Sequence, residues 1–277
     1  MDLPGITRCG KSLFRWGQRT YIMGIINLSP DSFSGDGCES LDSARQRALQ
    51  MVEDGADIID VGGESTRPDA GPVSVDEEIR RVIPFISSIS RDISSPVSID
   101  TYKCEVAEQA LNVGACMIND ISGCSIESGI AGLAAQKQVP VILTGNQRGK
   151  KVTDILESVI SQLKDLIERS IVCGVRPENI IVDPGVGFGK TVEQNLEIVR
   201  RLDEIKALGY PVLLGTSRKS FIAATVRSSQ EERFMGTAAS LAIGITRGAD
   251  IVRVHDVGQM KLICRMSDAI VGRDTGK

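Results

Sequence analysis

Acidic, amide and basic side chains recur in this sequence directly after short apolar runs. The clearest case is the stretch 180–190, IIVDPGVGFGK, in which Asp183 follows three β-branched residues and precedes Pro184 and a run of glycines. A carboxylate in this position can accept two hydrogen bonds from adjacent N–H groups of a flat ring. The glycines beside it would let the backbone pass close to such a ring, with Phe188 as a wall. These residues predict a binding site for a polar heterocycle.

The same pattern of an apolar run with a polar end recurs along the chain. The polar ends are Asn27 in 20–27, Asp60 in 55–63, Asp100 in 96–101, Asn119 in 114–120, and Arg253 and His255 in 248–256; Lys219 follows another apolar run at 211–215. Arg253 and His255 lie two residues apart, so both would point to the same side of one strand. Arginine and histidine with an asparagine nearby suit an anion such as phosphate. One site would then bind both a polar ring and an oxyanion.

Two of these residues also have a simpler interpretation. A carboxylate at a strand end, such as Asp100, can serve as the N-cap of the following helix. His255 is the single histidine of the chain and can have a purely structural role. The residue types alone leave these alternatives open.

The glycine run at 185–191, GVGFGKT, does not match a known nucleotide-binding motif. A P-loop needs a glycine where this chain has Pro184, and the spacing of one residue between glycines does not fit GxGxxG. The pattern therefore predicts close backbone approach to a ligand rather than a phosphate-binding loop.

The elements that carry these residues alternate between strand and helix. Apolar runs predict strands at 20–27, 57–62, 97–100, 115–119, 139–143, 180–183, 211–215 and 249–254. Amphipathic stretches predict helices at 41–54, 75–91, 103–113, 126–136, 153–173 and 192–208, then a broken helical region to 246 and a last helix to about 270. Thr153 is the expected N-cap of the fifth helix, and residues 11–18 are expected to form a short strand or hairpin at the bottom of a barrel.

Eight strands alternating with helices over 277 residues predict an α/β fold, a (β/α)8 TIM barrel. No linker or shift in charge divides the chain, so we expect a single domain over residues 1–277. Parallel α/β folds place ligand sites at the carboxyl ends of their strands. The polar strand ends should therefore meet at one mouth of the barrel.

The composition narrows the class of partner. A net charge of -4 and a pI of about 5.3 argue against nucleic acid and favour a small-molecule ligand. No run reaches the roughly 18 apolar residues of a membrane span, and the first residues lack the order of a signal peptide. The seven cysteines form no CxxC pair, which indicates reduced thiols and a cytoplasmic location.

Seven segments together resemble dihydropteroate synthase. They are 25–33 (IINLSPDSF), 60–68 (DVGGESTRP), 98–101 (SIDT), 118–123 (INDISG), 183–190 (DPGVGFGK), 217–221 (SRKSF) and 253–256 (RVHD). They span nearly the whole chain and occur in the order of the family. Chance similarity does not explain such a match.

The resemblance implies a pterin-binding barrel that joins 6-hydroxymethyl-7,8-dihydropterin diphosphate to 4-aminobenzoate and releases pyrophosphate. It implies that the pterin ring is held by Asp100, Asn119, Asp183 and Lys219, with Arg253 stacked on it. The diphosphate would be held by Asn27, Thr66, Arg253 and His255, with Asn27 acting through a Mg2+ ion. Phe33, Pro68, Phe188 and Ser220 would frame the aminobenzoate, and Arg67 is a further expected substrate-binding residue. The expected catalytic residues are Asp100, Lys219, Arg253 and His255, and the expected assembly is a homodimer sensitive to the sulfonamide class of inhibitor.

Two other functions fit parts of the same pattern. A methyltetrahydrofolate-dependent methyltransferase resembles this family in its pterin-binding barrel, but methyl transfer needs neither a clamp for diphosphate nor an enclosure for an arylamine. A non-catalytic pterin-binding paralogue is the second alternative. It is suggested by Thr144 and Gly145, which stand where the family commonly has Met-His after the fifth strand.

Overall fold

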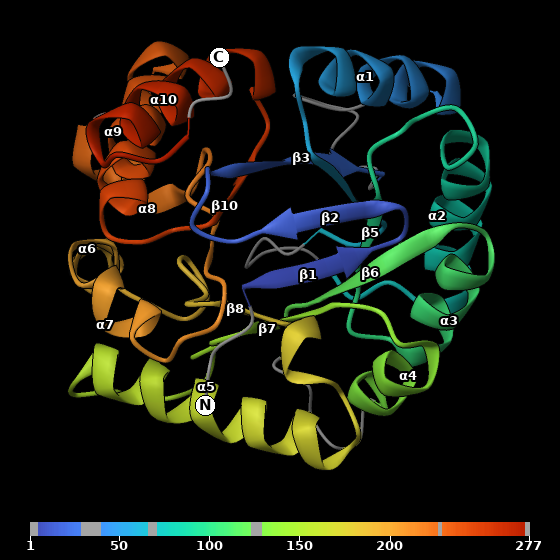
Figure 1. Ribbon diagram of the computed structural model, residues 1–277, viewed down its shortest axis with the longest axis horizontal. Helices are drawn as coiled ribbons and strands as arrows, with labels where there is room; N and C mark the ends of the chain where they lie inside the picture. Colours follow the sequence, from blue (N-terminus) through green and yellow to red (C-terminus); the bar gives the residue numbers. More distant parts are fainter. Residues whose placement is uncertain (1–4, 29–39, 66–70, 123–128, 227–228, 275–277) are drawn as a thin grey trace.

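Short β-branched runs form the strands of one parallel sheet (Figure 1). The computed structural model describes residues 5–28, 40–65, 71–122, 129–226 and 229–274. The strands are β3 (Tyr21–Asn27), β4 (Ile58–Gly62), β5 (Val97–Asp100), β6 (Ala115–Asp120), β7 (Val141–Thr144), β8 (Ile180–Asp183), β9 (Leu213–Leu214) and β10 (Ile251–Val254). Their order in the sheet is β8-β7-β6-β5-β4-β3-β10-β9. A parallel bridge between Val182 and Val212 joins the two outer strands, so the sheet closes into the predicted (β/α)8 barrel.

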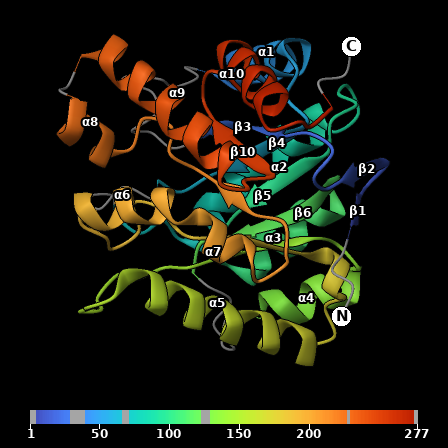
Figure 2. The same ribbon diagram turned by 60° about the vertical axis from the view of Figure 1, so that its left-hand side comes forward.

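Helices surround the barrel as an outer ring, as both views show (Figures 1 and 2). They are α1 (Leu41–Asp54), α2 (Val75–Ile89), α3 (Cys104–Asn112), α4 (Ile130–Lys137), α5 (Ile155–Val172), α6 (Val192–Arg200), α7 (Leu202–Lys206), α8 (Ser220–Val226), α9 (Gln230–Thr246) and α10 (Val257–Ile270). α1, α2, α3, α5 and α10 pack directly on barrel strands, whereas α8 packs against α6 and α9. None of the helices in the described ranges is long and apolar enough to cross a membrane.

Some element boundaries differ from those predicted. The helix expected at 192–208 is two helices that break at Arg201, whose φ of -113° and ψ of 28° leave the helical region. The break turns Leu202 and Ile205 into the core, where both are fully buried. The N-cap of α5 is Asp154 rather than Thr153, because the Asp154 carboxylate accepts the N–H of Glu157 at 2.9 Å.

Two further elements begin later than predicted. The strand expected at 139–143 is β7 at 141–144, since Pro140 has no N–H to donate to the sheet and only its carbonyl pairs, with the N–H of Ile118. The helix expected at 126–136 begins at Ile130, after Gly129 with a positive φ of 69°. Residues 126–128 lie outside the described part of the chain.

The barrel interior changes from apolar to polar along most strands, whereas β3 still has Ile25 two residues after Met23 and becomes polar only at Asn27. Side chains of alternate residues point inward. Toward the amino ends of the strands, here called the lower end of the barrel, the interior positions are fully buried apolar residues: Met23, Ile58, Met117, Ile142, Ile181, Leu213 and Ile251. Two residues further along, the same face carries Asp60, Asn119, Thr144, Asp183, Gly215 and Arg253. The period of two thus places an apolar plug below and a polar layer above it.

A hairpin of two antiparallel strands covers the lower end of the barrel. β1 (Ile6–Cys9) and β2 (Ser12–Arg15) pair with each other and not with the barrel strands. The hairpin lies across the end of the barrel in Figure 1 and at one edge of the molecule in Figure 2. Phe14, Trp16 and Tyr21 pack with ring centroids 4.9–5.6 Å apart. The predicted closing element is therefore confirmed, although it begins before residue 11.

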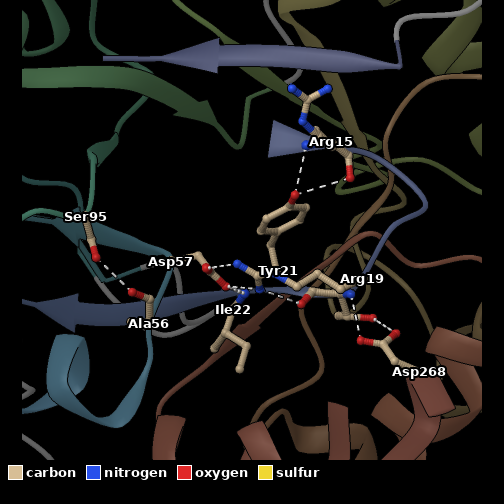
Figure 3. Close-up of polar contacts among 9 residues, drawn as sticks. Arg15, Arg19, Tyr21, Ile22, Ala56, Asp57, Ser95 and Asp268 are labelled. Carbon is tan, nitrogen blue, oxygen red and sulfur yellow. Dashed lines mark hydrogen bonds and ion pairs between the residues drawn. The ribbon is translucent and has the colours of Figure 1, made fainter. Parts of the chain in front are cut away.

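Polar contacts fix the hairpin to the first barrel strand (Figure 3). The Tyr21 hydroxyl accepts the N–H of Arg15 at 2.8 Å and donates to its carbonyl at 3.2 Å. The Asp57 carboxylate accepts two hydrogen bonds from Arg19 and one from the N–H of Ile22. These contacts hold the lower end of the barrel shut.

The hydroxyl of Tyr21 should contribute measurably to stability. Tyr21→Phe keeps the aromatic packing and removes both hydrogen bonds to Arg15, so the free energy of unfolding should fall by about 1–2 kcal/mol. Urea unfolding followed by circular dichroism measures this change. Tyr210→Phe, at a phenol outside the hairpin contacts, serves as the control. A loss no larger for Tyr21→Phe than for the control would contradict this account of how the hairpin is attached.

Candidate functional site

The predicted polar strand ends meet where the strands reach their carboxyl ends, at the upper mouth of the barrel. Asn27, Asp100 and Asp183 are the last residues of β3, β5 and β8, Asn119 is in β6, and Arg253 is in β10. Lys219 and Ser220 follow β9, and Phe188 lies in the loop after β8. Asp100 and Asn119 are direct neighbours in the sheet, as are Thr144 and Asp183. Phe33, Thr66, Arg67 and Pro68 lie outside the described residues.

Arg253 is the central cation of this mouth. Its Nε donates to Asp60 Oδ2 at 2.6 Å and its Nη2 donates to Asp100 Oδ2 at 2.5 Å. Burial lowers the pKa of Arg253, but the charges of Asp60 and Asp100 outweigh this and raise it above its usual range. Arg253 is therefore a permanent cation held between two carboxylates. The predicted stacking on a ring remains a prediction.

Asn119 and Asp60 form a second contact at the same place. The Asn119 amide donates to Asp60 Oδ2 at 3.0 Å, and both residues are buried. Asp60 was noted in the sequence as a polar strand end but was not included among the expected substrate-binding or catalytic residues. Its position two residues before the strand end, on the same face as Ile58 and Gly62, was the available signal.

Asp183 lies on the other side of the mouth and is not part of the contacts that Asp60 makes with Arg253 and Asn119. Its Oδ1 accepts the N–H of Gly185 at 2.7 Å, and 6% of the residue is exposed. Burial raises the pKa of Asp183, against the opposing charge of Lys219. The carboxylate therefore has capacity left for a ligand N–H group.

Several buried acceptors of this polar layer have no hydrogen-bond partner within the described residues. They are Asp60 Oδ1, Asp100 Oδ1, Asn119 Oδ1 and Thr144 Oγ1. An unmatched buried polar atom costs about 1–3 kcal/mol, and a ligand with matching donors would remove that cost. A ring that carries several N–H groups has the chemistry that this layer requires.

The charge of Asp100 depends on pH near neutrality. Burial raises the pKa of Asp100 to about 7, Arg253 acts in the opposite direction, and the charges of Asp60, Glu78 and Asp120 raise it further. A nearby group is shifted the other way, since burial lowers the pKa of Lys219 to about 8 while Asp183 acts to raise it. Near pH 7 Asp100 is therefore partly protonated, whereas Lys219 remains mostly charged.

Two cations and an aromatic ring form the outer part of the site. Lys219 Nζ lies 4.7 Å from the centre of the Phe188 ring and donates to the carbonyl of Val186. The Arg148 guanidinium lies 5.1 Å from the same ring. Phe188 is 7% exposed, so its ring is held in place, and its role as a wall for a ligand stays a prediction.

His255 and Asn27 complete the mouth. His255 Nδ1 lies 2.9 Å from Ser217 Oγ, which also accepts the His255 N–H at 3.3 Å. In the tautomer in which Ser217 Oγ donates its proton to Nδ1, Nε2 carries the single ring proton and can donate it to an anion. Asn27 is exposed at the end of β3, where its amide oxygen can reach a hard cation.

Lys190 secures the glycine loop to the neighbouring strand end. Its Nζ donates to the carbonyls of Gly145 at 2.7 Å, Gly185 at 2.8 Å and Phe188 at 3.3 Å. Gly189 has a φ of 67°, and a Cβ there would lie 2.3 Å from the backbone nitrogen of Arg148. The sequence predicted close approach to a ligand, which stays a prediction; the structure shows close approach to the loop after β7.

The raised pKa of Asp100 predicts a pH dependence of stability. The Asp100 carboxyl group has a pKa near 3.9 in the unfolded chain and about 7 in the folded protein. At pH values between these two, the folded protein therefore binds a proton that the unfolded chain has lost. The free energy of unfolding should therefore decrease as pH rises from about 4 to about 7, by up to about 1.4 kcal/mol per pH unit.

Urea unfolding of wild type and Asp100→Asn at several pH values measures this contribution. The difference between the two slopes isolates Asp100 from the other titrating groups. Parallel curves between pH 4 and 7 would contradict the shift.

Three comparisons with known proteins agree with this geometry. The model of the pterin-binding enzyme family matches residues 23–255. A dihydropteroate synthase of Clostridium beijerinckii is 50% identical over 268 residues, which cover 96% of this chain and 100% of that protein. A dihydropteroate synthase of Bacillus subtilis is 45% identical over 274 residues, which cover 99% and 96%.

Solved structures give the same result. A Clostridium difficile dihydropteroate synthase crystallised in the presence of pteroic acid has a TM-score of 0.88 at 50% identity, and the match covers 93% of this chain and 98% of that one. A Xanthomonas albilineans dihydropteroate synthase with 4-aminobenzoic acid has a TM-score of 0.90 at 36% identity, covering 96% and 98%. These similarities cover almost the whole of each protein.

Proposed function

The chain belongs to the dihydropteroate synthase family of pterin-binding enzymes, and we propose that it joins 6-hydroxymethyl-7,8-dihydropterin diphosphate to 4-aminobenzoate. The products are 7,8-dihydropteroate and pyrophosphate. The observation that carries this proposal is the layer of buried, unpartnered acceptors on Asp60, Asp100 and Asn119. A pterin ring supplies the N–H groups that such a layer lacks.

The pterin ring would lie between Asp100 and Asn119 on one side and Asp183 and Lys219 on the other. The carboxylates and the Asn119 oxygen accept N–H groups of the ring, and Lys219 donates to a ring acceptor. Burial of these groups supports the assignment, since hydrogen bonds to charged groups are strongest where water is excluded.

The diphosphate would lie at the outer edge of the mouth. Arg253 and His255 supply N–H donors to its oxygens, with Thr66 and Asn27 beside them. Asn27 would hold a Mg2+ ion together with diphosphate oxygens and water, the ligand set that this ion prefers. Oxygens of the diphosphate and of water would contribute the remaining ligands of this ion. Bound there, the ion would neutralise charge on the departing diphosphate.

The reaction breaks one bond and forms another at the pterin methylene carbon. The C–O bond breaks and the diphosphate leaves with the electron pair, which places positive charge on the pterin methylene. Asp100 and Asp183, in their ionised forms, stabilise that charge. The amine nitrogen of 4-aminobenzoate then forms the C–N bond and loses a proton. No side-chain nucleophile takes part.

The aminobenzoate would bind against the Phe188 wall. Phe188 is held between Lys219 and Arg148, and Ser220, at the start of α8, is exposed toward solvent. Phe33, Arg67 and Pro68 are proposed to complete this pocket. The motifs at 64–68 and 217–221 favour this reaction over methyl transfer, which has no diphosphate to hold and no arylamine to enclose.

Release of pyrophosphate tests the proposed reaction. Purified protein with Mg2+ should release pyrophosphate only when both the pterin diphosphate and 4-aminobenzoate are present, and chelation of Mg2+ should slow it. Binding of the pterin diphosphate by calorimetry without turnover would instead identify a non-catalytic pterin-binding protein.

Asp183→Asn should weaken pterin binding in the same assays. The substitution turns one accepting oxygen into a donor opposite a ring N–H, which costs about 2–3 kcal/mol, or roughly 30–150-fold in affinity. Asp203→Asn, at an exposed carboxylate on α7, is the control. Affinity of Asp183→Asn within about threefold of wild type would overturn the assignment of this residue.

We further propose a cytoplasmic homodimer. Leu262, Met266 and Ile270 are 64–67% exposed at successive turns of α10, and Met235 and Ile243 on neighbouring α9 are 61% and 50% exposed. Residues four apart share one helix face, so these side chains form an exposed apolar stripe of the kind that a second subunit covers. The cytoplasmic location is supported by the free cysteines of the described part.

Charge on this stripe should dissociate the dimer. Leu262→Asp should convert the wild-type dimer to a monomer, because the carboxylate would be buried without a partner. Light scattering after gel filtration measures the mass. Val172→Asp, at an 82% exposed apolar residue on α5, should leave the dimer intact, and a dimeric Leu262→Asp would place the interface elsewhere.

A further inference from the structure

Asp60 is a fully buried carboxylate that the proposed reaction does not use directly. It lies in β4, and its Oδ2 accepts hydrogen bonds from Asn119 in β6 and Arg253 in β10, at 3.0 and 2.6 Å. It thus joins a group assigned to the pterin ring and a group assigned to the diphosphate.

The contact with Asn119 determines which atom of that amide faces the ligand. An ionised carboxylate can only accept, so the amide nitrogen of Asn119 must point toward Asp60. This leaves Asn119 Oδ1, a buried atom for which the described residues offer no partner, to face the site. Asp60 therefore makes Asn119 an acceptor toward the ligand.

The contact with Arg253 fixes the plane of the guanidinium. Nε is held by Asp60 and Nη2 by Asp100, and a planar group anchored at two nitrogens cannot rotate. The remaining N–H groups then keep one direction. A guanidinium with one anchor would lack that restriction.

We propose that Asp60 is a positioning residue that sets the acceptor orientation of Asn119 and the plane of Arg253 for pterin diphosphate. This inference rests on the proposed function, because it concerns how the same substrate is recognised. Asp60 itself acts through its two neighbours.

The competing explanation is that Asp60 only stabilises the fold. Asp250 provides a matched comparison: it is also fully buried, accepts the Lys206 ammonium at 2.6 Å and the N–H of Val212 at 2.8 Å, and has an unpartnered Oδ1 among the described residues. It lies just before β10, at the opposite end of the barrel. Asp60→Asn and Asp250→Asn therefore remove similar charges in different places.

The first test is spectroscopic and does not depend on the reaction. In the nuclear magnetic resonance spectrum of the ligand-free protein, the side-chain amide signal of Asn119, assigned by its loss in Asn119→Asp, should shift in Asp60→Asn. The signal should stay in place in Asp250→Asn. An unchanged Asn119 signal in folded Asp60→Asn would overturn the inference even if turnover is confirmed.

The second test separates substrate binding from turnover. Asp60→Asn should raise KM for the pterin diphosphate about tenfold or more, while KM for 4-aminobenzoate changes by less than threefold. Asp250→Asn should change neither by more than threefold. An equal effect of both variants would reduce Asp60 to a structural role, whereas an inactive wild type would contradict the proposed function instead.

A swapped pair supplies the rescue. In Asp60→Asn with Asn119→Asp, the amide and the carboxylate exchange places, so the new carboxylate can accept from the new amide and keep an oxygen toward the ring. KM for the pterin diphosphate should recover at least threefold relative to Asp60→Asn. If Asp60→Asn does not fold, the swapped protein is compared with wild type, and failure of the folded swap to bind the pterin diphosphate would overturn the inference.

Discussion

The buried arrangement of Arg253 between Asp60 and Asp100 is the constraint on which this barrel mouth depends. Each of these charges would be costly to bury alone, by several kcal/mol even after relaxation. Held together at 2.5–2.6 Å, they offset one another and remain dry. Closure of the barrel is what makes the contact possible, because β10 and β5 are separated along the sheet by β3 and β4. The fold and the site are therefore built by the same geometry.

The alternation of inward and outward side chains along the strands makes the interior of the barrel apolar at its lower end and polar at its upper end. Below, Ile58, Ile142 and Ile181 fill the interior and the hairpin closes it. Above, two residues later on the same strands, polar atoms are buried with some of their hydrogen-bonding capacity unused. Capacity left unused in the lower end would only destabilise the protein. At the upper end a ligand can use it, so the cost carried by the free protein becomes part of the affinity.

The strands, most helices and the residues at the strand ends could be predicted because each is encoded within a few neighbouring residues. An apolar run of four to seven residues with a polar end is visible in the sequence, and parallel topology then brings those ends together. The break at Arg201 could not be predicted this way, because it depends on how Leu202 and Ile205 meet the core. The contacts made by Asp60 and Lys190 could not be predicted for a similar reason. Their partners are Arg253, 193 residues away, and Gly145, 45 residues away.

The protonation of the site links ligand binding to pH. In the free protein, burial raises the pKa of Asp100 to about 7 and lowers that of Lys219 to about 8, so near pH 7 Asp100 is partly protonated and Lys219 is mostly charged. A ring that donates N–H groups to Asp100 stabilises its charged form, which lowers its pKa. A ring acceptor opposite Lys219 stabilises the ammonium in the same way and raises its pKa. Binding would therefore favour the charged forms of both groups. In the proposed reaction the anionic form of Asp100 would stabilise positive charge on the pterin methylene, so the substrate would itself promote the ionisation that the reaction requires.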